Sequence, residues 1–213
     1  MRLDAALDVL GAMPFFDLAT VVQLTQESRA SLVGQLHRWC RSGKLVPLRR
    51  GMYTFADRYR RVTVSPAALA NALYRPSYIS GLWALGFYGL IPEGVSAYTS
   101  VTTRTPRRFD NPFGAFLYTA IKRSLFFGYR TVSVAGAEVV LATAEKALLD
   151  LFHLGSGEWD RARMIEMRFQ QAGIIDRQRL QDYAQRMGRP RILRAVNVWR
   201  ECCDAPDDDG VDL

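Results

Sequence analysis

Apolar residues recur at helical spacing over the first 42 residues of the chain. Leu32, Leu36 and Trp39 follow the i, i+4, i+7 spacing of one buried helix face. Asp17 and Ser28 stand where polar side chains cap the starts of helices. The pattern predicts helices over residues 2–12, 18–24 and 28–42, with a short polar turn between the last two.

The next stretch, residues 44–55 (KLVPLRRGMYTF), has the pattern of a hairpin. Short apolar strands are predicted over residues 45–48 and 52–55, with Arg49, Arg50 and Gly51 at the turn between them. Three helices followed by a basic-tipped hairpin are typical of a winged helix-turn-helix, whose third helix enters the major groove of DNA. Residues 1–58 are therefore predicted to form such a domain.

After a polar, basic connector at residues 57–63, apolar runs and turn residues alternate. Strands are predicted over residues 98–103, 115–121, 129–134 and 138–142. Helices are predicted over residues 66–74, 144–154, 158–172, 177–187 and 190–202. The apolar run 77–91 is expected to hold a buried helix that ends near Gly89, and residues 104–108 (RTPRR) are expected to form a basic loop. Thr143 is the expected cap of the helix that follows it.

Together these elements predict an α+β fold. The winged helix-turn-helix is followed by a mixed α/β C-terminal domain over residues 65–203, and this domain has a helical C-terminal end. Residues 204–213 (DAPDDDGVDL) are predicted to be an acidic, disordered tail.

Charge is unevenly spread along the 213 residues. Lys and Arg outnumber Asp and Glu by 28 to 21, a net charge of +7. Residues 1–58 carry +3, residues 59–130 carry +7 and residues 131–213 carry −3. Of the 28 basic residues 25 are Arg, which suits planar contacts to phosphate and guanine, although a GC-rich genome would also enrich Arg. The excess favours a polyanionic partner in the first two thirds of the chain.

Side chains that could contact DNA lie on the third helix and on the hairpin turn. Ser and Gln can donate to base edges or phosphates, and Arg can contact guanine with two hydrogen bonds. Arginines on the wing would reach phosphates or the minor groove. The candidates are Ser28, Arg29, Ser31, Gln35, Arg38, Arg49 and Arg50. A winged helix can instead be a protein-interaction module with a solvated polar face.

Basic residues also gather in the second domain, interleaved with aromatic residues. This C-terminal basic surface comprises Arg104, Arg107, Arg108, Lys122 and Arg123. The mixture could form a second nucleic-acid surface or a protein contact site, and solvated arginines are an equal alternative for each residue taken singly. The short RTPRR segment is the densest part of this surface.

The sequence has few of the residue patterns that are typical of catalytic sites. The two His are far apart in sequence, no Cys and His spacing suggests zinc, and no Gly-rich segment matches a phosphate loop. Glu138 with Glu145, Lys146 and Asp150 could form a metal-dependent nuclease cluster. The last three lie on one predicted helix, where capping and an i, i+4 pair explain them. We therefore expect no enzymatic activity, no metal and no cofactor.

The three Cys, Cys40, Cys202 and Cys203, do not suggest a disulfide framework. Asp4 and Asp8 interrupt the first apolar stretch, so no signal peptide is expected. No run of about 18 apolar residues predicts a membrane span. The expected location is the cytoplasm.

The order of segments resembles the AbiEi antitoxin family of type IV toxin–antitoxin systems. The resemblance rests on SRASLVGQLHRWCRSGKLVPL, RRGMYTF, PSYISGLWALGFYGLI, the VTT strand with its basic loop, and AEKALLDLF, and it covers roughly residues 15–155. It implies a winged helix that binds inverted repeats at its own promoter, a C-terminal domain with antitoxin activity, and self-association on DNA. It also implies a genetic partner, a nucleotidyltransferase-like toxin, that the antitoxin does not bind directly.

The sequence therefore predicts a transcriptional autorepressor and antitoxin. Two alternatives remain open at this stage. One is a nucleic-acid-processing enzyme or RNA-binding factor that uses the winged helix for targeting. The other is a stand-alone repressor without a toxin, whose second domain senses a ligand.

Overall fold

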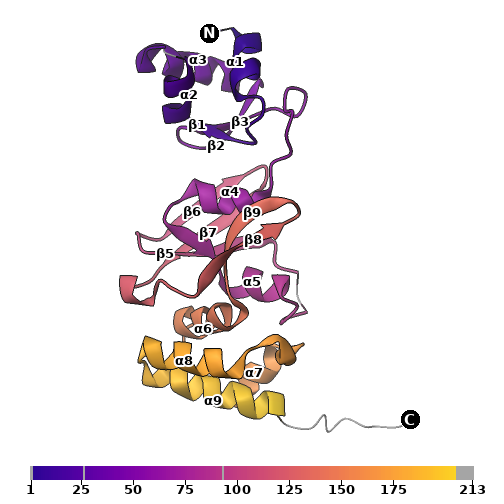
Figure 1. The fold of residues 1–213 in the computed structure, drawn as a ribbon, viewed down its shortest axis with the longest axis vertical. Helices are drawn as coiled ribbons and strands as arrows, with labels where there is room; N and C mark the ends of the chain where they lie inside the picture. The colour runs from indigo at the N-terminus through magenta and orange to yellow at the C-terminus, as the bar shows by residue number, and fades with distance from the viewer. Residues whose placement is uncertain (1, 26, 93, 205–213) are drawn as a thin grey trace, which may run out of the picture.

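A computed structural model describes residues 2–25, 27–92 and 94–204 and shows a mixed α+β chain whose elements fall into three stacked tiers (Figure 1). The first tier contains α1 (Leu3–Leu10), β1 (Phe16–Asp17), α2 (Leu18–Thr25), α3 (Arg29–Arg41), β2 (Leu45–Arg49) and β3 (Met52–Phe55). The second contains α4 (Pro66–Leu73), β4 (Ser77–Ile79), α5 (Gly81–Phe87), β5 (Ala97–Thr102), β6 (Arg107–Asn111), β7 (Gly114–Ala120), η1 (Arg123–Leu125), β8 (Tyr129–Val134) and β9 (Ala137–Ala142). The third contains α6 (Ala144–Leu154), α7 (Arg161–Glu166), η2 (Ala172–Ile174), α8 (Arg177–Met187) and α9 (Pro190–Asp204).

The first tier has three helices and a small antiparallel sheet of order β1-β3-β2. The two expected caps are confirmed: Thr20 N–H donates to Asp17 at 2.8 Å, and Ser31 N–H donates to Ser28 Oγ at 3.3 Å. The hairpin is confirmed as well, with Gly51 in the left-handed region that its tight turn requires. The two-residue strand β1 was missing from the sequence prediction, because a pair of residues has no readable alternation.

The second tier is a six-stranded mixed sheet of order β6-β7-β5-β4-β9-β8. β4 runs parallel to β9 and β5 runs parallel to β7, whereas the other neighbours are antiparallel. α4 packs on one face of this sheet and α5 and α6 on the other (Figure 1). Asn71 on α4 reaches the strand backbone: its Nδ2 donates to Val140 O at 3.1 Å, and Val140 N–H donates to its Oδ1 at 2.7 Å. These two hydrogen bonds pair the backbone of Val140 on β9 with the Asn71 side chain. β9 pairs with β4 only through Ile79 and Leu141.

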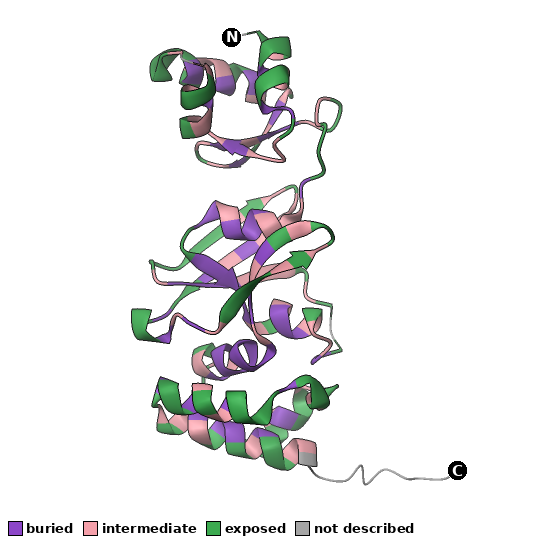
Figure 2. Cartoon of the chain, viewed as in Figure 1, coloured by how far each residue is buried: buried purple, intermediate pink, exposed green. Residues whose placement is uncertain are grey.

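The third tier is helical, as expected for the C-terminal end. Figure 2 shows α6 almost entirely buried between the sheet and the outer helices, while α8 and α9 expose their outer sides. Thr143 caps α6 through its hydroxyl, which accepts from Lys146 N–H at 3.3 Å. Among the described residues, no helix is both long and apolar enough to span a membrane.

Three local expectations were wrong, and one further strand was not predicted. The helix expected within residues 77–91 is α5, but residues 77–79 before it form the unpredicted strand β4, because Ile79 pairs with both β5 and β9. Arg107 and Arg108 belong to strand β6 and not to a loop, since β7 pairs with them. The helix expected over 158–172 is only Arg161–Glu166, and the left-handed backbone at Arg168 shows that the helix does not continue. In the expected tail, Asp204 is the last residue of α9, and residues 205–213 lie outside the described residues.

The hairpin of the first tier packs against the second. Leu48 and Met52 are buried and belong to the larger hydrophobic core, together with the sheet and α4. The remaining buried residues of the first tier form a separate small core around Leu36 and Phe55. Asn111 Nδ2 at the end of β6 donates to Leu48 O at 3.2 Å. The hairpin therefore belongs to two cores and fixes the position of the first tier on the edge of the large sheet.

Candidate nucleic-acid interface

Helix α3 presents an exposed, basic surface. Leu32, Leu36 and Trp39 are buried, so the opposite side of the helix faces solvent. Of the candidates, Ser28, Arg29, Ser31 and Arg38 are exposed, whereas Gln35 is half-buried. The expectation that Gln35 is fully exposed was therefore wrong, because it lies beside the buried positions of the helix.

The α3 candidates divide between two flanks. Ser31, Gln35 and Arg38 follow i, i+4, i+7 spacing and share one flank, whereas Arg29 lies about 200° around the helix from Ser31. The Ser31 hydroxyl also approaches the Glu27 carboxylate, at 3.4 Å. Because Arg29 and Arg38 lie on different flanks of α3, they would not contact the same base pairs.

The outermost stripe of α3 is formed by Ala30, Gly34, His37 and Arg41, which lie opposite the buried face. His37 and Arg41 are exposed, and neither was among the candidates. Extending the helical period of Leu32, Leu36 and Trp39 to the opposite face would have identified them. Arg41 adds a third exposed guanidinium to this helix.

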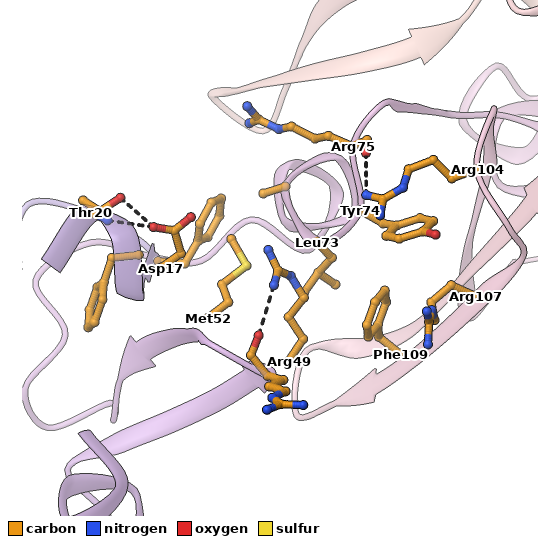
Figure 3. Close-up of a pocket in the computed structure, with 14 residues that line it drawn as sticks. Asp17, Thr20, Arg49, Met52, Leu73, Tyr74, Arg75, Arg104, Arg107 and Phe109 are labelled. Carbon is orange, nitrogen blue, oxygen red and sulfur yellow. Dashed lines mark hydrogen bonds between the residues drawn. The ribbon is translucent and has the colours of Figure 1, made fainter. Parts of the chain in front are cut away.

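A second basic feature is a cleft between the hairpin and the large sheet (Figure 3). It has a volume of about 550 Å³. The hairpin turn and β1 form one wall, and the end of α4, the loop after β5 and the start of β6 form the other. Five arginines line this basic cleft: Arg49, Arg50, Arg75, Arg104 and Arg107. The fold thus brings candidates on the hairpin turn and candidates of the C-terminal basic surface to the same cleft.

None of the five arginines of the basic cleft forms an ion pair with a carboxylate of the described residues, although the charge of Arg49 acts on the nearby Asp17. Arg49 is half-buried and points into the cleft, where its Nη1 donates to Arg50 O at 3.1 Å (Figure 3). Its Nε is buried and has no hydrogen-bond partner among the described residues. Arg104 lies over the Tyr74 ring at 4.5 Å and donates to Arg75 O at 3.1 Å, which holds its guanidinium plane in place.

The wall formed by the hairpin turn and β1 carries the one carboxylate of the lining, that of Asp17 (Figure 3). The backbone N–H of Thr20 donates to this carboxylate and holds the pKa of Asp17 below its usual value, and the nearby charge of Arg49 acts in the same direction. Asp17 is therefore ionised at neutral pH. Five of the fourteen residues that line the basic cleft are therefore cationic, and one is an ionised carboxylate.

The expected C-terminal basic surface is not one surface. Arg104 and Arg107 line the basic cleft, whereas Arg108, the next residue on β6, does not. Arg108 makes a bidentate ion pair with Asp110, at 2.7 and 2.8 Å, which offsets its charge. Lys122 and Arg123 are exposed at η1, outside the cleft. Arg75, a further basic residue of the second domain that was not among the final candidates, lines the cleft as well.

The residues weighed as a nuclease cluster do not face a common space. Glu138 is exposed on β9. Glu145 is buried, and its carboxylate accepts from Asp176 N–H at 3.0 Å. Among the described residues no group of three His, Cys, Asp or Glu side chains could hold a metal ion. The structure gives these carboxylates separate packing partners.

Lys146 and Asp150 form an ion pair on α6 in which both side chains are fully buried. The other Asp150 oxygen accepts from Tyr78 at 3.0 Å and from Ser80 at 2.7 Å. Burial lowers the pKa of Lys146 and raises that of Tyr78, so the phenol stays a neutral donor. The group ties α6 to β4 through a satisfied polar network.

Comparison with family models and with curated proteins gave no match. Among the described residues, helix α3 and the basic cleft gather most of the candidate basic side chains.

Proposed function

We propose that this protein is a DNA-binding transcriptional autorepressor and antitoxin of the AbiEi type. Its first tier would act as a winged helix-turn-helix, with α3 in the major groove and the β2–β3 hairpin as the wing. The observation that carries this proposal is the capped, exposed helix α3 with Arg29, Arg38 and Arg41, which follows α2 and precedes a hairpin with two arginines at its turn.

Phosphate contacts would supply most of the affinity, so binding is expected to weaken steeply with salt. Arg50 is exposed at the hairpin turn and suits such a contact. Arg49 turns into the basic cleft, so its part in a wing contact is smaller than that of Arg50. Arg29 and Arg38, on the two flanks of α3, would meet opposite walls of the groove.

Under the same proposal, two copies of the protein bind the inverted repeats of its own promoter, and the protein acts in the cytoplasm. The C-terminal part would counteract a nucleotidyltransferase-like toxin without binding it, and the protein itself would not be an enzyme. Coexpression with a neighbouring reading frame of that type tests this part. Growth rescued by the full chain supports it, and growth arrest despite equal expression of the chain contradicts it.

The test of DNA binding is a salt-titrated mobility shift on about 200 bp from upstream of the gene, against random DNA of equal length. Stepwise bands that resist the competitor support autorepression. Arg29→Ala is expected to cost about 1–3 kcal/mol and to relax specificity, and Arg50→Ala to weaken all sequences alike. Arg123→Ala removes the same charge from the second tier and is the control. Binding that random DNA abolishes overturns the proposal.

A further inference from the structure

The basic cleft has the size of a small-molecule site. Its volume of about 550 Å³ lies within the range of pockets that enclose drug-sized ligands. A DNA duplex presents its phosphates on a convex rod, so it can reach the exposed Arg50 at the rim but cannot fill a cleft of this volume. The remaining volume of the cleft is open to a smaller ligand.

The charge of the cleft indicates the chemistry of that partner. Five arginines line the cleft without an ion-pair partner among the described residues, and Arg binds phosphate through paired N–H donors. A ligand with two or more phosphate groups would satisfy several of these donors at once.

Flat surfaces stand beside the arginines. Phe109 is half-buried in the wall, and the Arg104 guanidinium lies over Tyr74, 4.5 Å from the centre of its ring. Both offer a plane on which a nucleobase can stack. Asp17, on the facing wall, can accept hydrogen bonds from the amino groups of a base or from ribose hydroxyls (Figure 3).

From this combination we propose that the basic cleft binds a nucleoside triphosphate, with the phosphates on the arginines and the base against Phe109 and Arg104. The ligand would touch the hairpin turn and the large sheet together, because the lining comes from both. Its effect on DNA rests on the proposed function: the triphosphate shares Arg49 and Arg50 with the wing, so bound nucleotide lowers the affinity for DNA.

The test is fluorescence anisotropy of ATP and GTP, each labelled on the ribose, with the full chain and without DNA. Saturable binding is expected, and unlabelled triphosphate should displace the label more strongly than inorganic pyrophosphate. Arg75→Ala with Arg107→Ala should weaken binding at least about tenfold, the scale for loss of charge-assisted hydrogen bonds. Both side chains are exposed, so the fold is retained. Lys122→Ala with Arg123→Ala removes the same two charges outside the cleft and should bind as wild type does.

The assignment is overturned if binding of the labelled nucleotides does not saturate, or if both double variants weaken it equally. It is also overturned if pyrophosphate displaces the label as strongly as triphosphate does, or if a short single-stranded RNA binds more tightly through the same arginines. Because DNA is absent from this measurement, its failure leaves the autorepressor proposal standing. GTP added to the mobility shift then tests the competition. An unchanged DNA affinity at saturating GTP overturns the competition.

Discussion

At the scale of single residues, Asp17 has two roles. It begins α2 by accepting from Thr20 N–H, and it forms one wall of the basic cleft. Replacement of an Asp cap by Ala costs about 1 kcal/mol of unfolding free energy. We expect this loss for Asp17→Ala at pH 7, and a smaller one for Asp17→Asn, whose amide oxygen still accepts the bond. Urea unfolding measures both, and equal losses for the two variants would rule out the capping explanation.

The pH dependence of that loss has a defined sign. The pKa of Asp17 in the folded protein lies below the ordinary value of 3.8, so the carboxylate adds stability above pH 3.8 and loses it as the pH falls through the folded value. The difference in stability between wild type and Asp17→Asn should therefore shrink in acid. A difference that grows as the pH falls would contradict the sign.

The buried pair of Lys146 and Asp150 predicts a larger effect. Asp150→Ala leaves an unpaired ammonium among apolar residues and deprives Tyr78 and Ser80 of their acceptor. A loss of about 3–5 kcal/mol is expected. Adding Lys146→Met to Asp150→Ala removes the unpaired charge and should restore part of the stability. A double variant less stable than Asp150→Ala in urea unfolding would show that the remaining hydroxyls, and not the ammonium, dominate the cost.

At the scale of elements, α3 can be tested on its outermost stripe. Arg41 is exposed on the side away from the core and continues the basic surface of the helix. If it contacts phosphate, Arg41→Ala should weaken binding to all DNA and reduce the salt slope by about 1. Arg123→Ala, with the same loss of charge on η1, should leave the slope unchanged. An unchanged slope in Arg41→Ala would remove this end of α3 from the interface.

Local signals in the sequence were sufficient for some elements and not for others. The helices Ala144–Leu154 and Arg177–Met187 match the prediction, since each has a cap and a clear apolar period. Strand β4 at residues 77–79 was not predicted, and residues 107–108 were wrongly assigned to a loop, because strand pairing partners far along the chain decide their conformation. The basic cleft could not be predicted for the same reason, because Arg49 and Arg107 line one cleft only once the hairpin packs on β6.

At the scale of the whole molecule, the net positive charge is concentrated in the first two thirds of the chain. Residues 1–58 carry +3 and residues 59–130 carry +7, whereas residues 131–204 hold 11 basic and 10 acidic residues, a net charge of +1. A polyanion would therefore be attracted to the end of the molecule that holds α3 and the basic cleft. This distribution of charge supports both proposals equally. Each is therefore tested against a control variant that removes the same charge at η1, either Arg123→Ala or Lys122→Ala with Arg123→Ala.

The hairpin also sets how the molecule unfolds. Met52 is buried in the larger core although it belongs to the first tier, and Leu48 beside it accepts from Asn111. Unfolding either tier would expose these side chains, so we expect one cooperative transition by calorimetry, with equal calorimetric and van't Hoff enthalpies. Met52→Ala should cost about 2–5 kcal/mol and reduce this coupling. Val33→Ala, on the exposed side of α3, should change little. Two resolved transitions in the wild-type protein would show that the tiers are energetically independent, and the two walls of the basic cleft could then separate without unfolding.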